Sequence, residues 1–184
     1  MKKIDYFKII HKYIKPDSLT YFLYIPHVVL VTSKALEVAT KLNLDERRLR
    51  FIKEASMLHD IGVISVNAHD LGCTGELDYI CHGVEGRKIL ESEGLTRHAM
   101  VAERHTGVGL TKKEILDKGL PIPARNMLAV TLEEKIISWA DLFYTKNPDK
   151  LWFEKTLEEV RVSVAKFGVS KVKIFDEWLK LFGS

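Results

Sequence analysis

Apolar residues recur at steps of three and four positions along most of this chain, and this period constrains the fold more than any other feature. After His27, one apolar stripe continues as far as Leu42, while the charged residues fall on other faces. A second stripe follows Asp45, whose side chain can cap a helix that runs down to His59. No run of alternating residues is long enough to predict a strand. The sequence therefore predicts an all-α protein.

Local signals predict the other helices and their ends. Gly62 is expected to end the helix that carries His59, because glycine tolerates the backbone angles of a C-terminal cap. Residues 63–81 mix polar, Gly and Cys residues and are expected to be irregular. Thr111 with Glu114, and Thr131 with Glu134, form capping-box patterns. Further helices are expected at about 83–92 and 97–105, after Thr111, after Thr131, after Asn147-Pro148, and in a last amphipathic segment with Val172, Phe175, Trp178, Leu179 and Phe182.

The length of 184 residues suits one domain with a sizeable core. Apolar residues make up 46% of the chain and charged residues 29%, which is an ordinary globular composition. We find no internal repeat, low-complexity segment or composition break that would mark a linker. Residues 1–184 are therefore predicted to form a single helical bundle, with the helices of residues 142–184 packed on the same domain.

The charges of the chain are balanced and well mixed. There are 28 Lys and Arg residues against 25 Asp and Glu residues, without the clustered basic stripe that duplex nucleic acid requires. A small phosphorylated ligand needs only a few local cations and is compatible with this pattern. The uncharged stretch from Ser18 to Ser33 is shorter than the ~20 apolar residues of a membrane span. We expect a cytoplasmic protein with no membrane partner and with Cys73 and Cys81 reduced.

Six residues form the ordered donor set of a metal centre. A His taken alone is more often a helix cap or a core residue than a ligand, so this prediction depends on the whole set. Nitrogen and oxygen donors without a thiolate favour Zn, Fe, Mn, Co or Ni. A carboxylate beside a His can also bridge two cations, so one or two divalent transition metals are expected. The six residues are His27, His59, Asp60, His82, His105 and Asp141.

The tetrapeptide His-Asp-Ile-Gly at positions 59–62, together with this order of donors, resembles the HD superfamily of metal-dependent hydrolases and its HDIG subgroup. The resemblance extends from about His27 to Asp141 and implies a helical HD domain. A minimal HD site lacks counterparts of His82 and His105, and this additional pair resembles family members that hold two metals.

Two further segments resemble a bacterial subgroup that cleaves dinucleoside polyphosphates. One is Arg104-His105-Thr106-Gly107, and the other is residues 131–141, which are similar to a stretch near the end of such domains. The segment that follows the first motif is longer in this chain than in that subgroup. The resemblance therefore implies the class of hydrolase rather than one substrate.

The family resemblance implies hydrolysis of a phosphate ester or anhydride in a nucleotide-like small molecule by metal-activated water, with Asp60 as the catalytic residue. Arg104 and Lys135 are candidates for binding the substrate's phosphate, and the alternative for both is a solvated surface cation. Two other functions stay open: a di-iron oxygenase, because HD-type oxygenases share the order of donors, and a non-catalytic nucleotide-binding module. His11 and His98 are expected at the surface. A homo-oligomer is compatible with the sequence.

Overall fold

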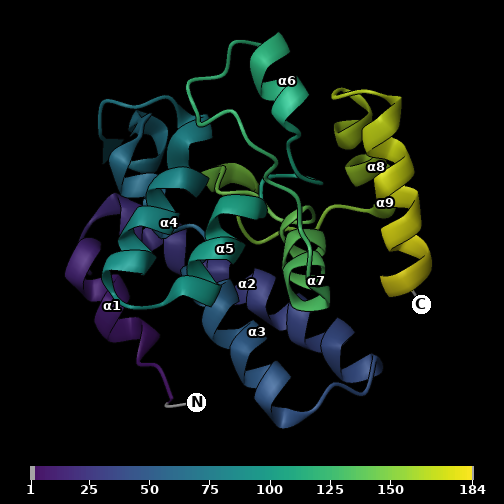
Figure 1. Ribbon diagram of the computed structural model, residues 1–184. Helices are drawn as coiled ribbons and strands as arrows, with labels where there is room; N and C mark the ends of the chain where they lie inside the picture. Colours follow the sequence, from purple (N-terminus) through teal and green to yellow (C-terminus); the bar gives the residue numbers. More distant parts are fainter. Residues whose placement is uncertain (1–2, 184) are drawn as a thin grey trace.

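Helices make up nearly all of the regular structure in the computed structural model, which describes residues 3–183 (Figure 1). This confirms the predicted all-α class. The α-helices of the described residues are α1 (Tyr6–Tyr13), α2 (Leu19–Lys41), α3 (Glu46–Leu58), α4 (His82–Ser92), α5 (Thr96–Arg104), α6 (Lys112–Asp117), α7 (Leu132–Asp141), α8 (Leu157–Ala165) and α9 (Val169–Phe182).

The segment between α3 and α4 contains short elements rather than a helix. A small antiparallel hairpin pairs β1 (Asn67–Ala68) with β2 (Cys73–Thr74). Around it lie the 3₁₀ turns η1 (Ile61–Ser65), η2 (His69–Leu71) and η3 (Tyr79–Cys81), and a fourth turn, η4 (Pro148–Lys150), follows α7. Asn147 was expected to cap a longer helix, but its side chain caps only η4, and the next α-helix begins after Thr156.

The central helix α2 is longer than its apolar stripe predicted. Ser18 caps it by accepting a hydrogen bond from the Tyr21 N–H, and the helix runs through Pro26. His27 therefore lies inside the helix and not at its start. Burial of Leu23 and Tyr24 upstream helps to offset the backbone hydrogen bond that proline cannot donate. Of the helices described, α2 alone has the length and apolar character of a membrane span, yet half of its most apolar window is buried inside the protein.

The predicted role of Gly62 as a helix cap is wrong. Helix α3 ends at Leu58, and Gly62 lies in η1 without a left-handed backbone. A Cβ atom on Gly62 would lie 2.0 Å from the carbonyl oxygen of His82 and 2.2 Å from the backbone nitrogen of Gly86. Glycine is needed here because η1 and α4 approach each other backbone to backbone.

Two apolar clusters flank the middle of α2. The first joins α2 and α3 to α7, α8 and α9, and Trp139 stacks on Phe175 there with ring centroids 5.3 Å apart. The second joins α1, α2 and α3 to η1, α4 and α5. Val28 belongs to the second cluster and Val31 to the first, so His27 lies where the two clusters meet.

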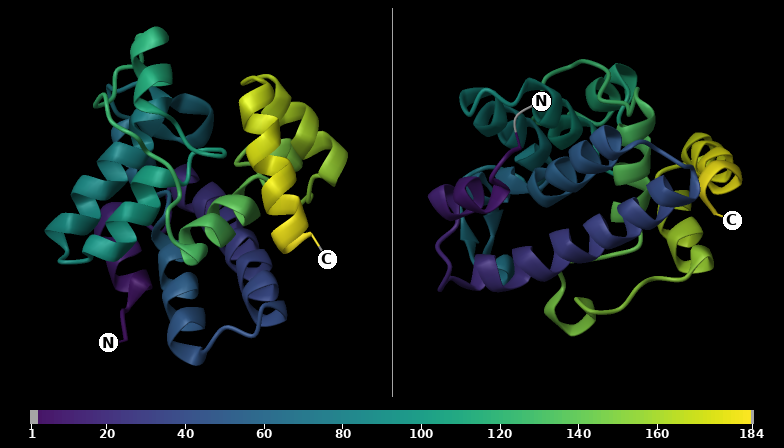
Figure 2. Two further views of the ribbon diagram at one scale, coloured as in Figure 1. Left: turned by 45° about the vertical axis from the view of Figure 1, so that its right-hand side comes forward. Right: turned by 90° about the horizontal axis from the view of Figure 1, so that it is seen from below.

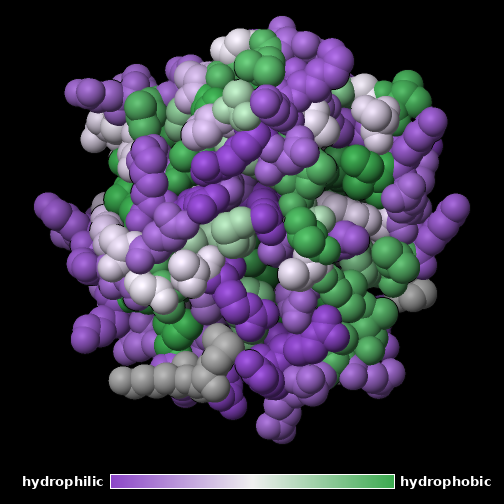
Figure 3. All heavy atoms as spheres, viewed as in Figure 1, coloured by the Kyte–Doolittle hydropathy of each residue, from purple (hydrophilic) through white to green (hydrophobic). Residues whose placement is uncertain are grey.

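The C-terminal helices α8 and α9 pack side by side along one flank of the molecule, as the views in Figure 2 show. Apolar side chains of both helices enter the core cluster around α7. Other apolar side chains of this region stay exposed, among them Phe167, Val169 and Leu181, and Figure 3 shows apolar atoms among hydrophilic ones on this side. The hairpin of α8 and α9 thus forms a wall beside the end of α7.

Candidate metal centre

Different helices bring the six predicted donors to one place. His27 comes from the middle of α2, Asp141 from the end of α7, and the adjacent pair His59 and Asp60 from the turn after α3. The ligand atoms of these four residues lie within 4.8 Å of one another. The Nε2 of His27 is 3.0 Å from Asp60 Oδ2 and 3.1 Å from Asp141 Oδ1, and the Nε2 of His59 is 3.2 Å from Asp60 Oδ2.

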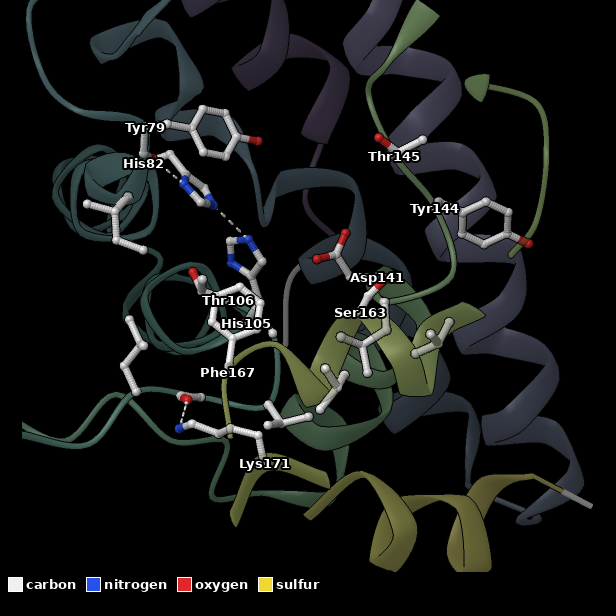
Figure 4. Close-up of a pocket in the computed structure, with 18 of the residues that line it drawn as sticks. Tyr79, His82, His105, Thr106, Asp141, Tyr144, Thr145, Ser163, Phe167 and Lys171 are labelled. Carbon is white, nitrogen blue, oxygen red and sulfur yellow. Dashed lines mark hydrogen bonds between the residues drawn. The ribbon is translucent and has the colours of Figure 1, made fainter. Parts of the chain in front are cut away.

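A second group of donors shares Asp60 with the first. His82 begins α4 and His105 follows α5, and the Nε2 atom of each lies 3.5 Å from Asp60 Oδ1. One carboxylate thus presents one oxygen to each group. Figure 4 shows the His82 and His105 rings turned toward each other, with the Asp141 carboxylate across from them.

Backbone carbonyls fix the orientation of three of the four imidazoles. The Nδ1 atom of His59 donates to the Ser56 carbonyl at 2.6 Å, and those of His82 and His105 donate to carbonyls three residues earlier, at 2.6 and 2.8 Å. When the ring is neutral, a proton on Nδ1 leaves the lone pair on Nε2, which faces Asp60 in each case. Such hydrogen bonds are typical of metal-binding histidines, because they select the tautomer that coordinates.

The centre fits a cation. Among the described residues, the buried atoms without a hydrogen-bond partner include Nε2 of His27, Nε2 of His59 and Oδ1 of Asp60, while Asp60 Oδ2 has the Lys146 ammonium 2.5 Å away. The Nε2 atoms of His82 and His105 are 3.1 Å apart, so two lone pairs face each other when both rings are neutral. A cation bound between them would relieve this repulsion and would coordinate the nitrogen and oxygen atoms that lack a hydrogen-bond partner. The nitrogen and oxygen donor set suits a divalent transition metal.

Electrostatic effects inside the cluster are strong. Burial alone would lower the pKa of His59, but the nearby Asp60 and Asp141 carboxylates outweigh it and raise that pKa to about 10. Burial dominates at His82 and lowers its pKa to about 4, which keeps this imidazole neutral. Burial would raise the pKa of Asp60, but the Lys146 ammonium and His59 hold it well below its usual range. Asp60 is therefore ionised and available to cations.

Lys146 belongs to the centre but was missed in the sequence. Its ammonium lies 2.5 Å from Asp60 Oδ2 and 3.2 Å from the Tyr79 hydroxyl, and only 12% of its side chain is exposed. Lys146 stands in the loop after α7, outside any helical period, so no pattern relates it to Asp60. Its separation of five residues from Asp141 is the only signal that the sequence offers.

A cavity of about 370 Å³ opens beside the donors, which is within the usual size range of small-molecule sites. His27, His82, His105 and Asp141 form its floor. Apolar side chains from α8 and from three loops also line the cavity, together with Tyr79 and Lys146. The apolar residues are Val108, Leu110, Leu142, Val160, Val164 and Phe167.

The two predicted phosphate-binding residues do not line this cavity. Arg104 instead pairs with Glu134, with Nη1 3.1 Å from each carboxylate oxygen, and Lys135 lies on α7 away from the lining. Glu134 also accepts from the Val130 N–H, so the expected capping box at Thr131 is only half formed. The pair of Arg104 and Glu134 links α5 to the start of α7.

The prediction that His98 lies at the surface is wrong. Its exposed fraction is 2%, and its Nε2 is 3.6 Å from a carboxylate oxygen of Glu54 on α3. His98 precedes His105 by seven residues, which puts both on the inward face of α5. His11 is exposed, as expected, and His69 is exposed in η2.

Comparisons with known proteins identify the family of this chain and several similar proteins. Residues 24–145 match the HD domain family. An uncharacterized protein of Methanocaldococcus jannaschii is 35% identical over 128 residues, which cover 67% of this chain and 68% of that protein.

Two tRNA (cytidine(56)-2'-O)-methyltransferases are also similar. The one from Picrophilus torridus is 32% identical over 65% of this chain and 30% of its own length. The one from Thermoplasma volcanium is 31% identical over 86% of this chain and 43% of its own length. This chain thus spans less than half of each methyltransferase.

Among solved structures, the HD domain of the L. monocytogenes phosphodiesterase PgpH is similar, with a TM-score of 0.53 and 14% identity over 95% of both chains. The same domain in complex with cyclic-di-AMP gives a TM-score of 0.52. At this identity the likeness concerns the fold.

Proposed function

Since this chain belongs to the HD domain family, we propose that it is a metal-dependent hydrolase of phosphate esters or anhydrides in a nucleotide-like small molecule. The observation that supports this most is the pair of donor groups that share the buried Asp60 and border a cavity. Neither a thiolate nor a Ser-His pair is needed for this chemistry.

The proposed roles follow from the geometry. His27, His59, Asp60 and Asp141 would hold one divalent ion, and Asp60, His82 and His105 would hold a second. When bound, such ions lower the pKa of water toward 7 and neutralise charge on a phosphoryl group. Asp60 is the proposed catalytic residue, because it reaches both groups and its burial prevents water from screening its charge.

The lining supports a substrate that is partly anionic and partly apolar. Candidate metal ligands and Lys146 line one part of the cavity, and the aliphatic side chains of α8 offer a surface for a nucleoside-sized group. The structurally similar HD domain of a protein named as a phosphodiesterase was solved in complex with cyclic-di-AMP. Two relatives of this chain are named as tRNA methyltransferases. These names favour nucleotide chemistry for this chain as well.

Metal analysis and a substrate panel test the proposal. Purified protein is assayed with phosphomonoesters, nucleotides and cyclic dinucleotides, with Mn²⁺, Co²⁺, Ni²⁺, Zn²⁺ or Fe²⁺, in air and without oxygen. We expect turnover that chelators abolish and that oxygen does not affect. Turnover that requires oxygen would assign the chain to the oxygenases, and metal binding without turnover would leave a nucleotide-binding module.

Asp60→Asn provides the decisive variant of this assay. The substitution keeps the size of the side chain and removes the charge shared by both donor groups, so we expect a loss of at least 100-fold in turnover, in the range that electrostatic groups contribute. Metal content should fall as well. Asp149→Asn, at an exposed position of η4, is the control and should behave as wild type.

A further inference from the structure

We propose that Lys146 holds a phosphoryl oxygen of the substrate, and that the Tyr79 hydroxyl positions its ammonium for this contact. This inference rests on the proposed function and deepens it, because it assigns a residue to the anionic part of the substrate. Neither residue belongs to the six donors of the metal centre.

The ionic partner of Lys146 is Asp60, and a bound metal would compete for this carboxylate. Its ammonium contacts Asp60 Oδ2 at 2.5 Å, and this same oxygen lies 3.0 Å from Nε2 of His27 and 3.2 Å from Nε2 of His59. An oxygen in that position would be a ligand of a bound metal. Once a cation neutralises Asp60, the buried ammonium lacks an anion, and burying an unpaired charge is costly.

The cavity supplies the place for a new anion. Lys146 lines the cavity beside His27 and Asp141, so a phosphate that approaches the donors from this space meets the ammonium directly. An ammonium between a metal centre and the cavity repels the metal and attracts phosphate. Both effects turn Lys146 away from Asp60 and toward the substrate.

The other lysines on the lining have different partners. The ammonium of Lys155 donates to the carbonyls of Leu142 and Tyr144, at the C-terminal end of α7. Lys171 donates to the Gly109 carbonyl and to Glu114. Lys118 is exposed, and its ammonium lies 5.8 Å from the centre of the Phe167 ring. Along the described lining, Lys146 is thus the lysine whose ionic partner is a metal-ligand carboxylate.

Tyr79 connects Lys146 to the metal centre. Its hydroxyl accepts from Lys146, its carbonyl accepts from Nδ1 of His82 at 2.6 Å, and its ring lies 4.8 Å from the His82 ring. One residue of η3 therefore orients an imidazole of the centre and the ammonium beside it. This makes Tyr79 a positioning residue.

Binding measurements on metal-loaded protein test the role of Lys146. Inorganic phosphate is titrated calorimetrically into wild type, Lys146→Met, Lys146→Arg and Tyr79→Phe, each loaded with Mn²⁺, and Mn²⁺ affinity is measured separately. We expect Lys146→Met to weaken phosphate binding about 10- to 100-fold, as for a lost charge-assisted hydrogen bond, and to bind Mn²⁺ at least as tightly as wild type. Lys146→Arg should restore most phosphate affinity, and Tyr79→Phe should weaken it a few-fold.

Lys150→Met is the matched control, since it removes an exposed lysine from the same loop. Unchanged phosphate affinity in Lys146→Met would overturn the proposal for Lys146 alone. Loss of Mn²⁺ from a folded Lys146→Met protein would overturn it too, by showing that the lysine supports the metal centre. Wild type that binds no phosphate in the presence of metal would contradict the proposed function itself.

Discussion

Gly62 shows how one residue couples the metal centre to the packing of the bundle. The three backbone atoms that a Cβ on Gly62 would meet within 3.0 Å belong to α4, whose first residue is His82, so a larger residue must shift the start of this helix. We expect Gly62→Ala to destabilise the fold by about 3 kcal/mol or more, because backbone atoms cannot rotate away from an overpacked contact. Denaturant unfolding and metal content measure the two effects.

Gly119→Ala is a suitable control for this substitution. Gly119 has a φ of 58° and open space around its Cβ position, so alanine there costs only the strain of a left-handed backbone, about 1–2 kcal/mol. If Gly62→Ala were no more costly than Gly119→Ala, the close approach of η1 to α4 would not constrain the centre.

The sequence analysis selected six candidate donors that the structure brings together, but it did not identify the residues around them. Their order along the chain resembles a family pattern, so no knowledge of packing was needed to select His27, His59 or Asp60. The position of Lys146 beside Asp60, and the need for glycine at position 62, depend on which segments of the chain pack together. The spacing of residues within one helix does not reveal such contacts. Arg104 was chosen for its position next to His105, but adjacent residues of a helix point in different directions, and Arg104 turns to Glu134.

At the level of elements, Lys171 ties α9 to the loop that borders the cavity. Its side chain is 5% exposed and donates to the Gly109 carbonyl at 2.6 Å and to Glu114 Oε2 at 2.7 Å. Glu114 also closes the capping box of α6 with Thr111, which the sequence predicted. The contact thus joins the wall formed by α8 and α9 to α6.

This contact predicts a specific pH dependence of stability. Burial would raise the pKa of Glu114, but Lys171 and the hydrogen bonds from Thr111 outweigh it and lower that pKa from 4.5 to about 2. A carboxylate with a lowered pKa stabilises the folded state above pH 4.5, and this contribution is lost as the pH falls from 4.5 to 2. We expect Glu114→Gln to be less stable than wild type by about 1–3 kcal/mol at pH 7 and equal to it near pH 2.

Chemical denaturation of both proteins across this pH range measures the difference, with Glu158→Gln on the exposed face of α8 as the control. A difference that stays constant from pH 7 to pH 2 would show that Glu114 acts through packing and not through its charge.

The sequence predicted the start of a helix correctly at three positions where a polar side chain caps the backbone. The predicted helices after Asp45, Thr111 and Thr131 begin where those side chains accept a backbone hydrogen bond. The first helix, α1, was not predicted, and the helix expected after Asn147-Pro148 begins only after Thr156, as α8. Both have caps that the sequence analysis did not use: Asp5 accepts a hydrogen bond from the Lys8 N–H, and Thr156 forms a capping box with Glu159.

At the scale of the whole molecule, the donor set crosslinks the bundle. The candidate ligands come from α2, α4 and α7 and from the ends of α3 and α5, so a bound ion would connect both apolar clusters. The unfolded chain has no such arrangement of donors, and metal binding therefore adds to the stability of the folded state.

We expect the melting temperature to rise on addition of metal and to fall again with a chelator. At a metal concentration 100 times the Kd, the gain is about 2.7 kcal/mol, which corresponds to about 5–10 °C for a chain of this length. Asp60→Asn should lose the response because it affects both donor groups, whereas His82→Ala should keep the part that comes from His27, His59, Asp60 and Asp141. Differential scanning calorimetry with Mn²⁺ and then EDTA measures these shifts. Equal shifts in wild type and Asp60→Asn would place the stabilising metal away from this centre.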